Sequence, residues 1–207
     1  MDSSILFKGI LLGFAIAAPV GPIGVLCIRR TLAFGRLHGL LSGIGAASAD
    51  AIYGAIAAFG LTVISHFLLD QQIWLHALGG SFLCFLGVQT WRAKVADKPA
   101  NLAGSRQLFS AYTTTLVLTL TNPMTILSFI SIFAGIGITS SEVRSSLFLV
   151  FGVFCGSAAW WLLLSVCVGH FREKMNKKML VWVNRLSAGI IFSFGMVSLW
   201  QVIGNLL

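Results

Sequence analysis

Asp50 is the residue of this sequence that can most readily carry chemistry, because it is the only acidic residue deep within an apolar stretch. A carboxylate at the centre of a bilayer costs at least ~2.5 kcal/mol, so its presence indicates a functional site. Asp50 could carry a proton or, when ionised, hold a substrate ammonium group. The sequence predicts no buried lysine or arginine that could pair with Asp50. This favours a mobile partner, which is either a proton or a cationic group of the substrate. The alternative is a structural aspartate that is hydrogen-bonded between helices.

Two proline-containing segments provide the complementary chemistry, Pro19-Val20-Gly21-Pro22 and Asn122-Pro123. Proline removes a backbone donor and clashes with the preceding turn, so a helix must break at each segment. In lipid, such a break is tolerated only where protein or a water-filled cavity satisfies the freed groups. Beyond each break a half-helix begins, and its free amides and positive dipole end suit a carboxylate. Neutral hydrogen-bonding groups near the second break are Thr121, Asn122, Thr125 and Ser128.

Helix ends that bind anions, combined with one carboxylate, match a zwitterion such as an amino acid. A proton-coupled transporter of another small polar solute would use the same groups. At ~1.5 Å per residue, both breaks, Asp50 and Ser157 fall near the centres of their apolar stretches, at the depth where transporters bind substrate. The predicted substrate and proton site consists of Pro19, Gly21, Pro22, Asp50, Asn122, Pro123, Thr125 and Ser157.

The elements that position these residues are predicted to be transmembrane helices. The chain has 207 residues, of which 57% are hydrophobic and 10% charged, and its mean hydropathy is +0.92. A soluble domain carries roughly 25% charged residues. Six apolar runs reach the length of about 20 residues that a bilayer requires. They are Ile5–Ile28, Gly39–Leu61, Ile73–Trp91, Leu108–Ala134, Ser146–Val168 and Val183–Ile203. We therefore expect an all-α, polytopic membrane protein with a single domain over residues 1–207.

Basic residues follow the first, third and fifth predicted spans and account for most of the net charge of +8. By the positive-inside rule these three loops are cytoplasmic and both termini lie outside. Because the basic residues do not share one soluble face, we expect the protein to lie in a lipid bilayer and not to bind nucleic acid. The basic residues are Arg29, Arg30 and Arg36, then Arg92, Lys94, Lys98 and Arg106, then Arg172, Lys174, Lys177, Lys178 and Arg185.

The chain also divides into two similar halves, approximately residues 1–91 and 106–207, joined by a basic connector at 92–105. Each half has three spans, an odd number, so the second half must be inverted relative to the first. A 3+3 inverted repeat with broken first and fourth helices is typical of secondary transporters. Glycine pairs at four-residue spacing, such as Gly152 and Gly156, allow either internal packing or a homodimer. Of Trp160 and Trp161 inside the fifth span, one is expected to wall a substrate cavity.

Other chemistries find little support. The cysteines Cys27, Cys84, Cys155 and Cys167 lie in apolar runs without metal-ligand spacing, and are read as small buried hydrophobes. We predict no enzyme, no cofactor and no resident metal. Two alternatives to a transporter of amino-acid-like solutes remain. A divalent metal-ion exporter would need several carboxylates or thiolates at the midplane, whereas a non-transporting membrane scaffold would need no midplane carboxylate.

The two breaks also carry a family resemblance. Pro19-Val20-Gly21-Pro22, the segment Arg29-Arg30-Thr31-Leu32-Ala33-Phe34-Gly35-Arg36-Leu37-His38-Gly39-Leu40 and Asp50 together resemble the amino-terminal signature of the lysine-exporter (LysE/RhtB) type of translocators. Thr121-Asn122-Pro123-Met124-Thr125-Ile126-Leu127 resembles the second motif of that family.

The resemblance implies an exporter of amino acids or their derivatives in the inner membrane, driven by the proton-motive force. It places Pro19, Gly21, Pro22, Asp50, Asn122 and Pro123 at the transport site. Three positions depart from the common pattern: Ala49 stands where many members have Gly, Ile23-Gly24 where many have Asn or Gln, and Met124 where many have Lys. The resemblance therefore does not imply lysine as the substrate.

Overall fold

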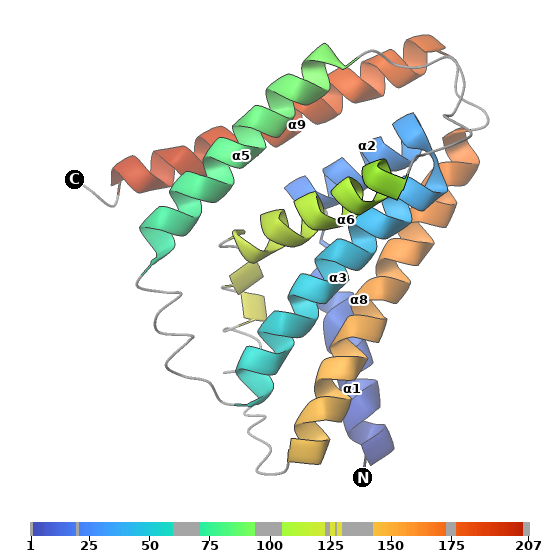
Figure 1. Ribbon diagram of the computed structural model, residues 1–207, viewed down its shortest axis with the longest axis vertical. Coiled ribbons are helices and arrows are strands. Elements are labelled where there is room, and N and C mark those ends of the chain that lie inside the picture. The colour runs from blue at the N-terminus through green and yellow to red at the C-terminus, as the bar shows by residue number, and fades with distance from the viewer. Residues whose placement is uncertain are drawn as a thin grey trace.

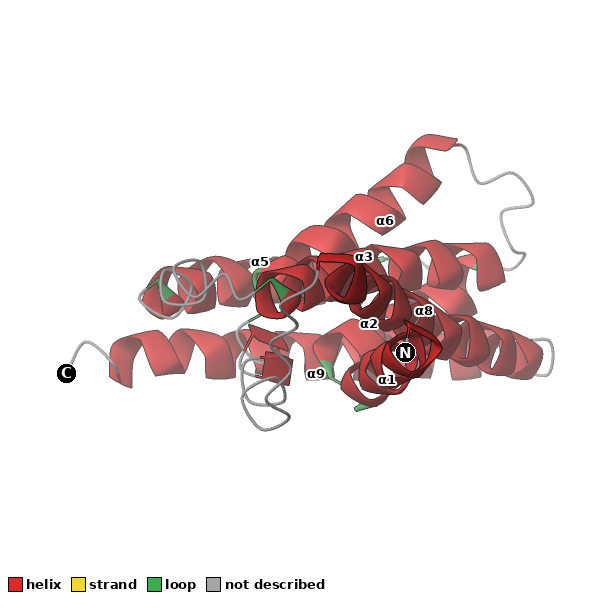
Figure 2. Ribbon diagram, turned by 90° about the horizontal axis from the view of Figure 1, so that it is seen from below, coloured by secondary structure: helices red, strands yellow, loops and turns green. Residues whose placement is uncertain are grey.

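The computed structural model describes residues 2–19, 21–59, 71–93, 105–122, 125–126, 128–129, 143–172 and 177–204. Over these ranges the chain forms seven α-helices and no strand (Figures 1 and 2). The helices are α1 (Asp2–Ala17), α2 (Pro22–Phe34), α3 (Arg36–Ala58), α5 (Gln72–Arg92), α6 (Ser105–Leu120), α8 (Val143–Arg172) and α9 (Lys177–Gly204). The prediction of an all-α protein is confirmed.

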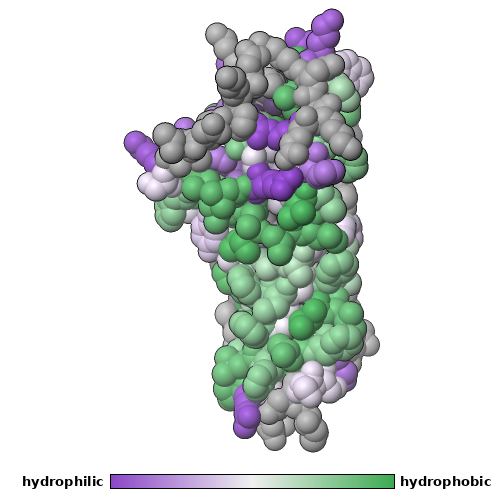
Figure 3. Space-filling model, turned by 90° about the vertical axis from the view of Figure 1, so that its right-hand side faces the viewer, coloured by the Kyte–Doolittle hydropathy of each residue, from purple (hydrophilic) through white to green (hydrophobic). Residues whose placement is uncertain are grey.

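Four of these helices, α3, α5, α8 and α9, are long and apolar enough to cross a membrane. The pair α1 and α2 passes the same test together, which raises the number of candidate spans in the described chain to five. A hydrophobic band lies between hydrophilic residues at the two ends of the molecule (Figure 3). The protein is therefore a multi-pass membrane protein. The predicted fourth span, Leu108–Ala134, begins in the 16-residue helix α6 and runs into residues outside the described ranges, so the count of six spans stays a prediction.

The predicted break in the first span is present. Helix α1 ends at Ala17, α2 begins at Pro22, and the two axes differ by 82°. Gly21 is extended, and Pro22 occupies the first turn of α2, where its missing amide leaves no intrahelical bond unmade. The chain therefore changes direction at the residues that the sequence singles out.

The second break begins at the end of α6. Thr121 forms a turn after this helix. The Asn122 carbonyl oxygen then accepts hydrogen bonds from the backbone N–H groups of Thr125 (3.1 Å) and Ile126 (3.3 Å). Residues 125–126 and 128–129 are again helical. Helical hydrogen bonding thus restarts at Asn122, while Pro123 lies outside the described residues.

The predicted boundaries of the basic loops are wrong in two places. Helix α2 continues through Arg29 and Arg30 to Phe34, and only Gly35, with φ 101°, separates it from α3. A φ in this positive range favours glycine. Helix α9 likewise begins at Lys177 and contains Arg185. The prediction ended the first span before the charge of Arg29 and began the sixth at Val183, after Lys177 and Lys178. A helix continues, however, wherever a charged side chain can reach polar partners or snorkel to the membrane surface.

The helices form two contacting groups (Figure 1). Helix α8 packs along α1 and α3, α6 packs on α3, and α5 pairs lengthwise with α9. Helix α2 contacts α3, α8 and α9, so it links the two groups. Glycines permit the tightest approach: a Cβ at Gly13 would overlap the carbonyl oxygen of Val153, and one at Gly156 that of Ile10. This pair of glycine-rich faces packs within one chain, and the homodimer stays a prediction.

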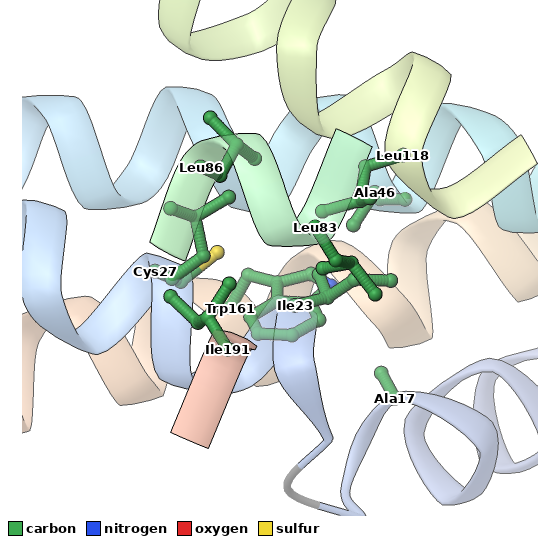
Figure 4. Packing of buried hydrophobic residues seen from close by; sticks show 11 residues of the cluster. Ala17, Ile23, Cys27, Ala46, Leu83, Leu86, Leu118, Trp161 and Ile191 are labelled. Atoms are coloured by element: carbon green, nitrogen blue, oxygen red, sulfur yellow. The ribbon is translucent and has the colours of Figure 1, made fainter. Parts of the chain in front are cut away.

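A hydrophobic cluster fills the region where α2 meets its neighbours (Figure 4). Cys27 is fully buried there, in agreement with its interpretation as a small buried hydrophobic residue. Cys84 and Cys155 are half-buried and Cys167 is exposed on the helix surface, so the prediction of burial is wrong for these three. The cluster also contains Ile23 and Trp161, which line the cavity described below. The packed core therefore forms one wall of that cavity.

Candidate functional site

A cavity of about 280 Å³ lies at the break between α1 and α2. Its walls come from the end of α1, the start of α2, the middle of α3, the end of α6 with the residues after it, and single side chains of α8 and α9. The lining residues are Ile16, Ala17, Pro19, Gly21, Pro22, Ile23, Gly24, Ala46, Asp50, Thr119, Asn122, Thr125, Ser128, Trp161 and Phe194. Segments that are more than 170 residues apart in the chain thus meet around one space.

Most of the predicted site residues lie in this lining. They are Pro19, Gly21, Pro22, Asp50, Asn122 and Thr125. Ser157 is not part of the lining, but it contacts Asp50 directly. Pro123 falls outside the described residues. The fold therefore brings both predicted breaks and the buried carboxylate together.

Asp50 is held by a short chain of hydrogen bonds from α8. The hydroxyl of Ser157 donates to Asp50 Oδ2 at 2.7 Å, and Trp161 Nε1 donates to the Ser157 hydroxyl oxygen at 3.2 Å. Only 3% of Asp50 is exposed. The carboxylate is therefore hydrogen-bonded between helices, as the structural alternative expects, and it also faces a cavity. This arrangement fixes the orientation of the carboxylate beside the cavity.

The first turn of α2 presents backbone to the same cavity. By helix geometry the first amides of a helix have no intrahelical acceptor. Ile23 and Gly24, which carry such amides, both line the cavity. Gly24 has no side chain to cover the backbone, so a ligand can approach this helix end closely. The start of α2 favours an anionic group and the Asp50 carboxylate favours a cationic group, and both line the same cavity.

On the opposite wall, Asn122 donates from Nδ2 to the Thr125 hydroxyl oxygen at 3.1 Å. Ser128 also lines the cavity, whereas Thr121 lies in an adjoining cavity of about 280 Å³ next to His76 and Ser198. The neutral hydrogen-bonding groups predicted near the second break are therefore divided between two spaces.

The two neighbouring tryptophans of α8 have different surroundings. Trp161 is 4% exposed and lines the cavity. Trp160 packs edge-on against Phe14, with ring centroids 5.2 Å apart. Thr119 and Phe194, which the sequence analysis missed, also line the cavity. Thr119 lies one helical turn before Asn122, so the helical period could have identified it, whereas nothing local marks Phe194.

Arg30 of α2 is buried as well, but its partners are not Asp50. Arg30 is 9% exposed, and its Nη1 donates to the Ser42 hydroxyl oxygen (2.9 Å), the Thr115 hydroxyl oxygen (2.8 Å) and the Ala111 carbonyl oxygen (2.9 Å). Its Nη2 donates to the Thr114 hydroxyl oxygen at 2.6 Å. These acceptors are uncharged, so Arg30 joins α2 to α3 and α6 without involving Asp50.

No group of three or more His, Cys, Asp and Glu side chains within the described ranges could hold a metal ion. Among the described residues that line the cavity, Asp50 is the single acidic one.

Comparison with known proteins agrees with this geometry. The family model for the LysE type translocator matches residues 14–201, which include both breaks and Asp50. The chain belongs to the LysE type translocator family. This translocator is 27% identical over 214 residues to the "Putative amino acid efflux protein YcgF" of Bacillus subtilis (strain 168), a match that covers 99% of each chain.

The translocator is also 27% identical over 140 residues to the "Uncharacterized membrane protein YahN" of Escherichia coli (strain K12), covering 67% of this chain and 63% of YahN. It is 24% identical over 189 residues to the "Uncharacterized membrane protein slr1627" of Synechocystis sp. (strain ATCC 27184 / PCC 6803 / Kazusa), covering 87% of this chain and 88% of that protein. No solved structure matches the translocator.

Proposed function

We propose that this LysE-type translocator is a secondary transporter that exports an amino acid or amino-acid-like solute across the inner membrane, coupled to protons. The observation that carries the proposal is the cavity in which the start of α2, Asp50 and Asn122 meet. The name of its full-length relative YcgF supports the same solute class.

The cavity offers each end of a zwitterion a suitable partner. The Asp50 carboxylate would bind the ammonium group of the solute. The free amides at the start of α2 and the polar groups of Asn122 and Thr125 would bind its carboxylate. Small-molecule sites commonly measure about 300–1,000 Å³, so a cavity of about 280 Å³ suits a small solute.

Asp50 would also couple export to protons. With Asp50 ionised, the solute ammonium is held against it and is carried outward. After release, a proton taken up at Asp50 removes its charge for the return. Since one carboxylate cannot hold both partners, solute and proton compete and move in opposite directions. The Ser157 hydroxyl keeps the carboxylate oriented in both states.

Alternating access would use the two breaks of a six-span, 3+3 inverted repeat with both termini outside and the basic segments cytoplasmic. The packing supports this arrangement. Exchanging the halves turns the contact of α1 with α8 into a contact of α6 with α3, and both contacts occur. The small residues at the centre of α3 and α8 are used in the same way, because Gly45 packs against α6 and Gly156 against α1.

The two alternatives fit the cavity less well. A divalent metal ion prefers several ionic ligands, whereas the described lining supplies the single carboxylate of Asp50. A non-transporting scaffold has no use for a carboxylate beside a cavity at this depth, since burial of the group is costly.

Transport by the purified translocator in liposomes tests the proposal. We would measure uptake of a panel of radiolabelled amino acids into these liposomes with and without an imposed pH gradient. Wild-type protein should transport at least one of them faster under the gradient. Asp50→Asn keeps the size and hydrogen-bonding shape of the side chain but removes its ionisable group, and should lose the gradient-driven component.

The matched control is Asp2→Asn, which makes the same chemical change at the first residue of α1, away from the cavity lining. It should transport like the wild type. Undiminished gradient-driven transport by Asp50→Asn would refute the assigned role of Asp50, and saturable uptake of a divalent metal in place of amino acids would establish the metal-exporter alternative.

A further inference from the structure

A second cavity, of about 520 Å³, lies along the same helix α2 but near its other end. It is bounded by the ends of α2 and α5 and the starts of α3 and α6. The lining residues are Arg29, Arg30, Phe34, His38, Gln89, Ala93, Arg106, Gln107, Ser110 and Ala111. Neither the family comparison nor the transport site described above assigns a role to this space.

Positive charge dominates the lining of the cavity. It contains the three guanidinium groups of Arg29, Arg30 and Arg106, with no acidic residue among its described members. The two acidic residues in the described ranges are Asp2, at the start of α1, and Asp50, which lines the other cavity. A low-dielectric cleft lined by one sign of charge concentrates ions of the opposite sign.

The environment of Arg30 adds a second observation. Its four hydrogen-bond acceptors are three hydroxyl oxygens and one carbonyl oxygen. Hydrogen bonds to neutral groups satisfy the guanidinium donors, but they do not compensate its charge. Buried charges are normally paired, because an isolated one is costly. The partners of Arg29 are neutral as well. Its Nε donates to the amide oxygen of Asn184 at 2.9 Å, and its guanidinium lies 5.8 Å from the Phe34 ring centre.

The position of this cavity relates it to the transport site. Gly24 lines the first cavity and Arg30 the second, and six residues of one helix correspond to a separation of about 9 Å. The basic cavity also lies at the end of the helices that the positive-inside pattern predicts to be cytoplasmic. A solute that leaves the cell would meet the arginines before it reaches Asp50.

We propose that this basic cavity binds the carboxylate of the transported solute as it enters from the cytoplasm, so that the substrate class is carboxylate-bearing solutes with zero or negative net charge. The inference rests on the proposed function and deepens it. Cationic solutes such as basic amino acids would be repelled at entry. Anionic lipid headgroups offer related chemistry, and the test separates them from the solute.

A cysteine reporter measures the charge preference of the cavity without a transport assay. Gln107, an exposed residue of its lining, would be changed to Cys after replacement of the four native cysteines by Ala. We would compare its rates of reaction with a sulfonate-bearing and a trimethylammonium-bearing methanethiosulfonate, in phosphatidylcholine vesicles at low salt. Ser4→Cys, at an exposed position of α1, is the reference.

The sulfonate-to-ammonium rate ratio should be on the order of tenfold higher at position 107 than at position 4. Arg106→Gln should lower this preference several-fold, as should Arg29→Gln. Arg144→Gln removes the same charge at the start of α8 and should leave it unchanged. Sodium propionate should slow sulfonate labelling at position 107, whereas propylammonium chloride at the same ionic strength should not.

Equal ratios at positions 107 and 4, or an unchanged ratio in both arginine variants, would overturn the proposal. Failure of propionate to slow labelling, together with slowing by phosphatidylglycerol in the vesicles, would assign the cavity to lipid headgroups instead. These outcomes are independent of transport. If position 107 shows no preference for the sulfonate reagent but transport still depends on Asp50, only the basic entry site is rejected. If position 107 shows the preference but transport does not depend on Asp50, only the coupling role of Asp50 is rejected.

Discussion

Replacing Ser157 by Ala should destabilise the translocator, whereas replacing Ser165 by Ala should not. Both serines are buried on α8, with exposures of 0% and 2%. The Ser157 hydroxyl donates to Asp50 and accepts from Trp161. The Ser165 hydroxyl has no hydrogen-bond partner among the described residues. The two substitutions are therefore chemically identical and differ in the bonds that they remove.

The expected difference follows from those bonds. A hydrogen bond to a charged group contributes about 1.5–3 kcal/mol, although interhelical hydrogen bonds in membrane helices average about 0.6 kcal/mol. Ser157→Ala also leaves the buried indole N–H of Trp161 without its partner. We expect Ser157→Ala to be about 1–3 kcal/mol less stable than Ser165→Ala. Ser165→Ala should itself be neutral or slightly stabilising, because it removes an unpaired buried hydroxyl.

Reversible unfolding of the purified protein in mixed micelles, followed by tryptophan fluorescence, would measure both free energies of unfolding. The near-ultraviolet circular dichroism of the folded variants would show whether the packing around Trp161 is retained. A difference between the two variants below about 0.5 kcal/mol, the range of ordinary surface substitutions, would refute the inference that Ser157 anchors Asp50.

Three further outcomes follow from the packing and the cavity. Gly156→Ala should lower the thermal midpoint strongly, because its Cβ would overlap the backbone of α1, whereas Gly189→Ala, with open space around it, should not; equal midpoints would contradict the close approach of the helices. Trp161→Phe should raise the KM for export, while Trp160→Phe, which changes a residue outside the cavity lining, should leave it near the wild-type value; the reverse order would contradict the placement of Trp161. Asn122→Ala should reduce transport per molecule of folded protein, measured as uptake divided by the amount of detergent-extracted monodisperse protein. If uptake and the amount of monodisperse protein fell by the same factor, Asn122 would be structural.

Much of the site could be predicted because its residues conflict with their apolar surroundings. A proline within an apolar run must break the helix, and the chain turns by 82° at that place. A carboxylate in such a run must find polar partners, and Asp50 finds Ser157. Asn122 was recognisable for the same reason. These signals are local, since each depends on one residue and its immediate neighbours.

The prediction from the sequence was wrong where a charged residue was taken to mark the end of a helix, as at Arg29. Arg30 lies within α2 because hydroxyl groups of α3 and α6 accept its hydrogen bonds. Those acceptors lie as many as 85 positions away in the sequence, so no local pattern could reveal them. The basic cavity was missed for this reason, as was the contribution of Phe194 to the transport cavity.

By itself, the sequence determined that the protein is helical and apolar, where its first helix breaks, and which acidic residue lies within the apolar stretches. These properties depend on backbone geometry and on the cost of burying single groups, which are set residue by residue. The tertiary structure alone decided that both breaks and Asp50 share one cavity, that Trp161 and not Trp160 lines it, and that the arginines of α2 surround a second cavity. Those properties depend on which helix faces meet, and close contacts between helices distant in the sequence determine that.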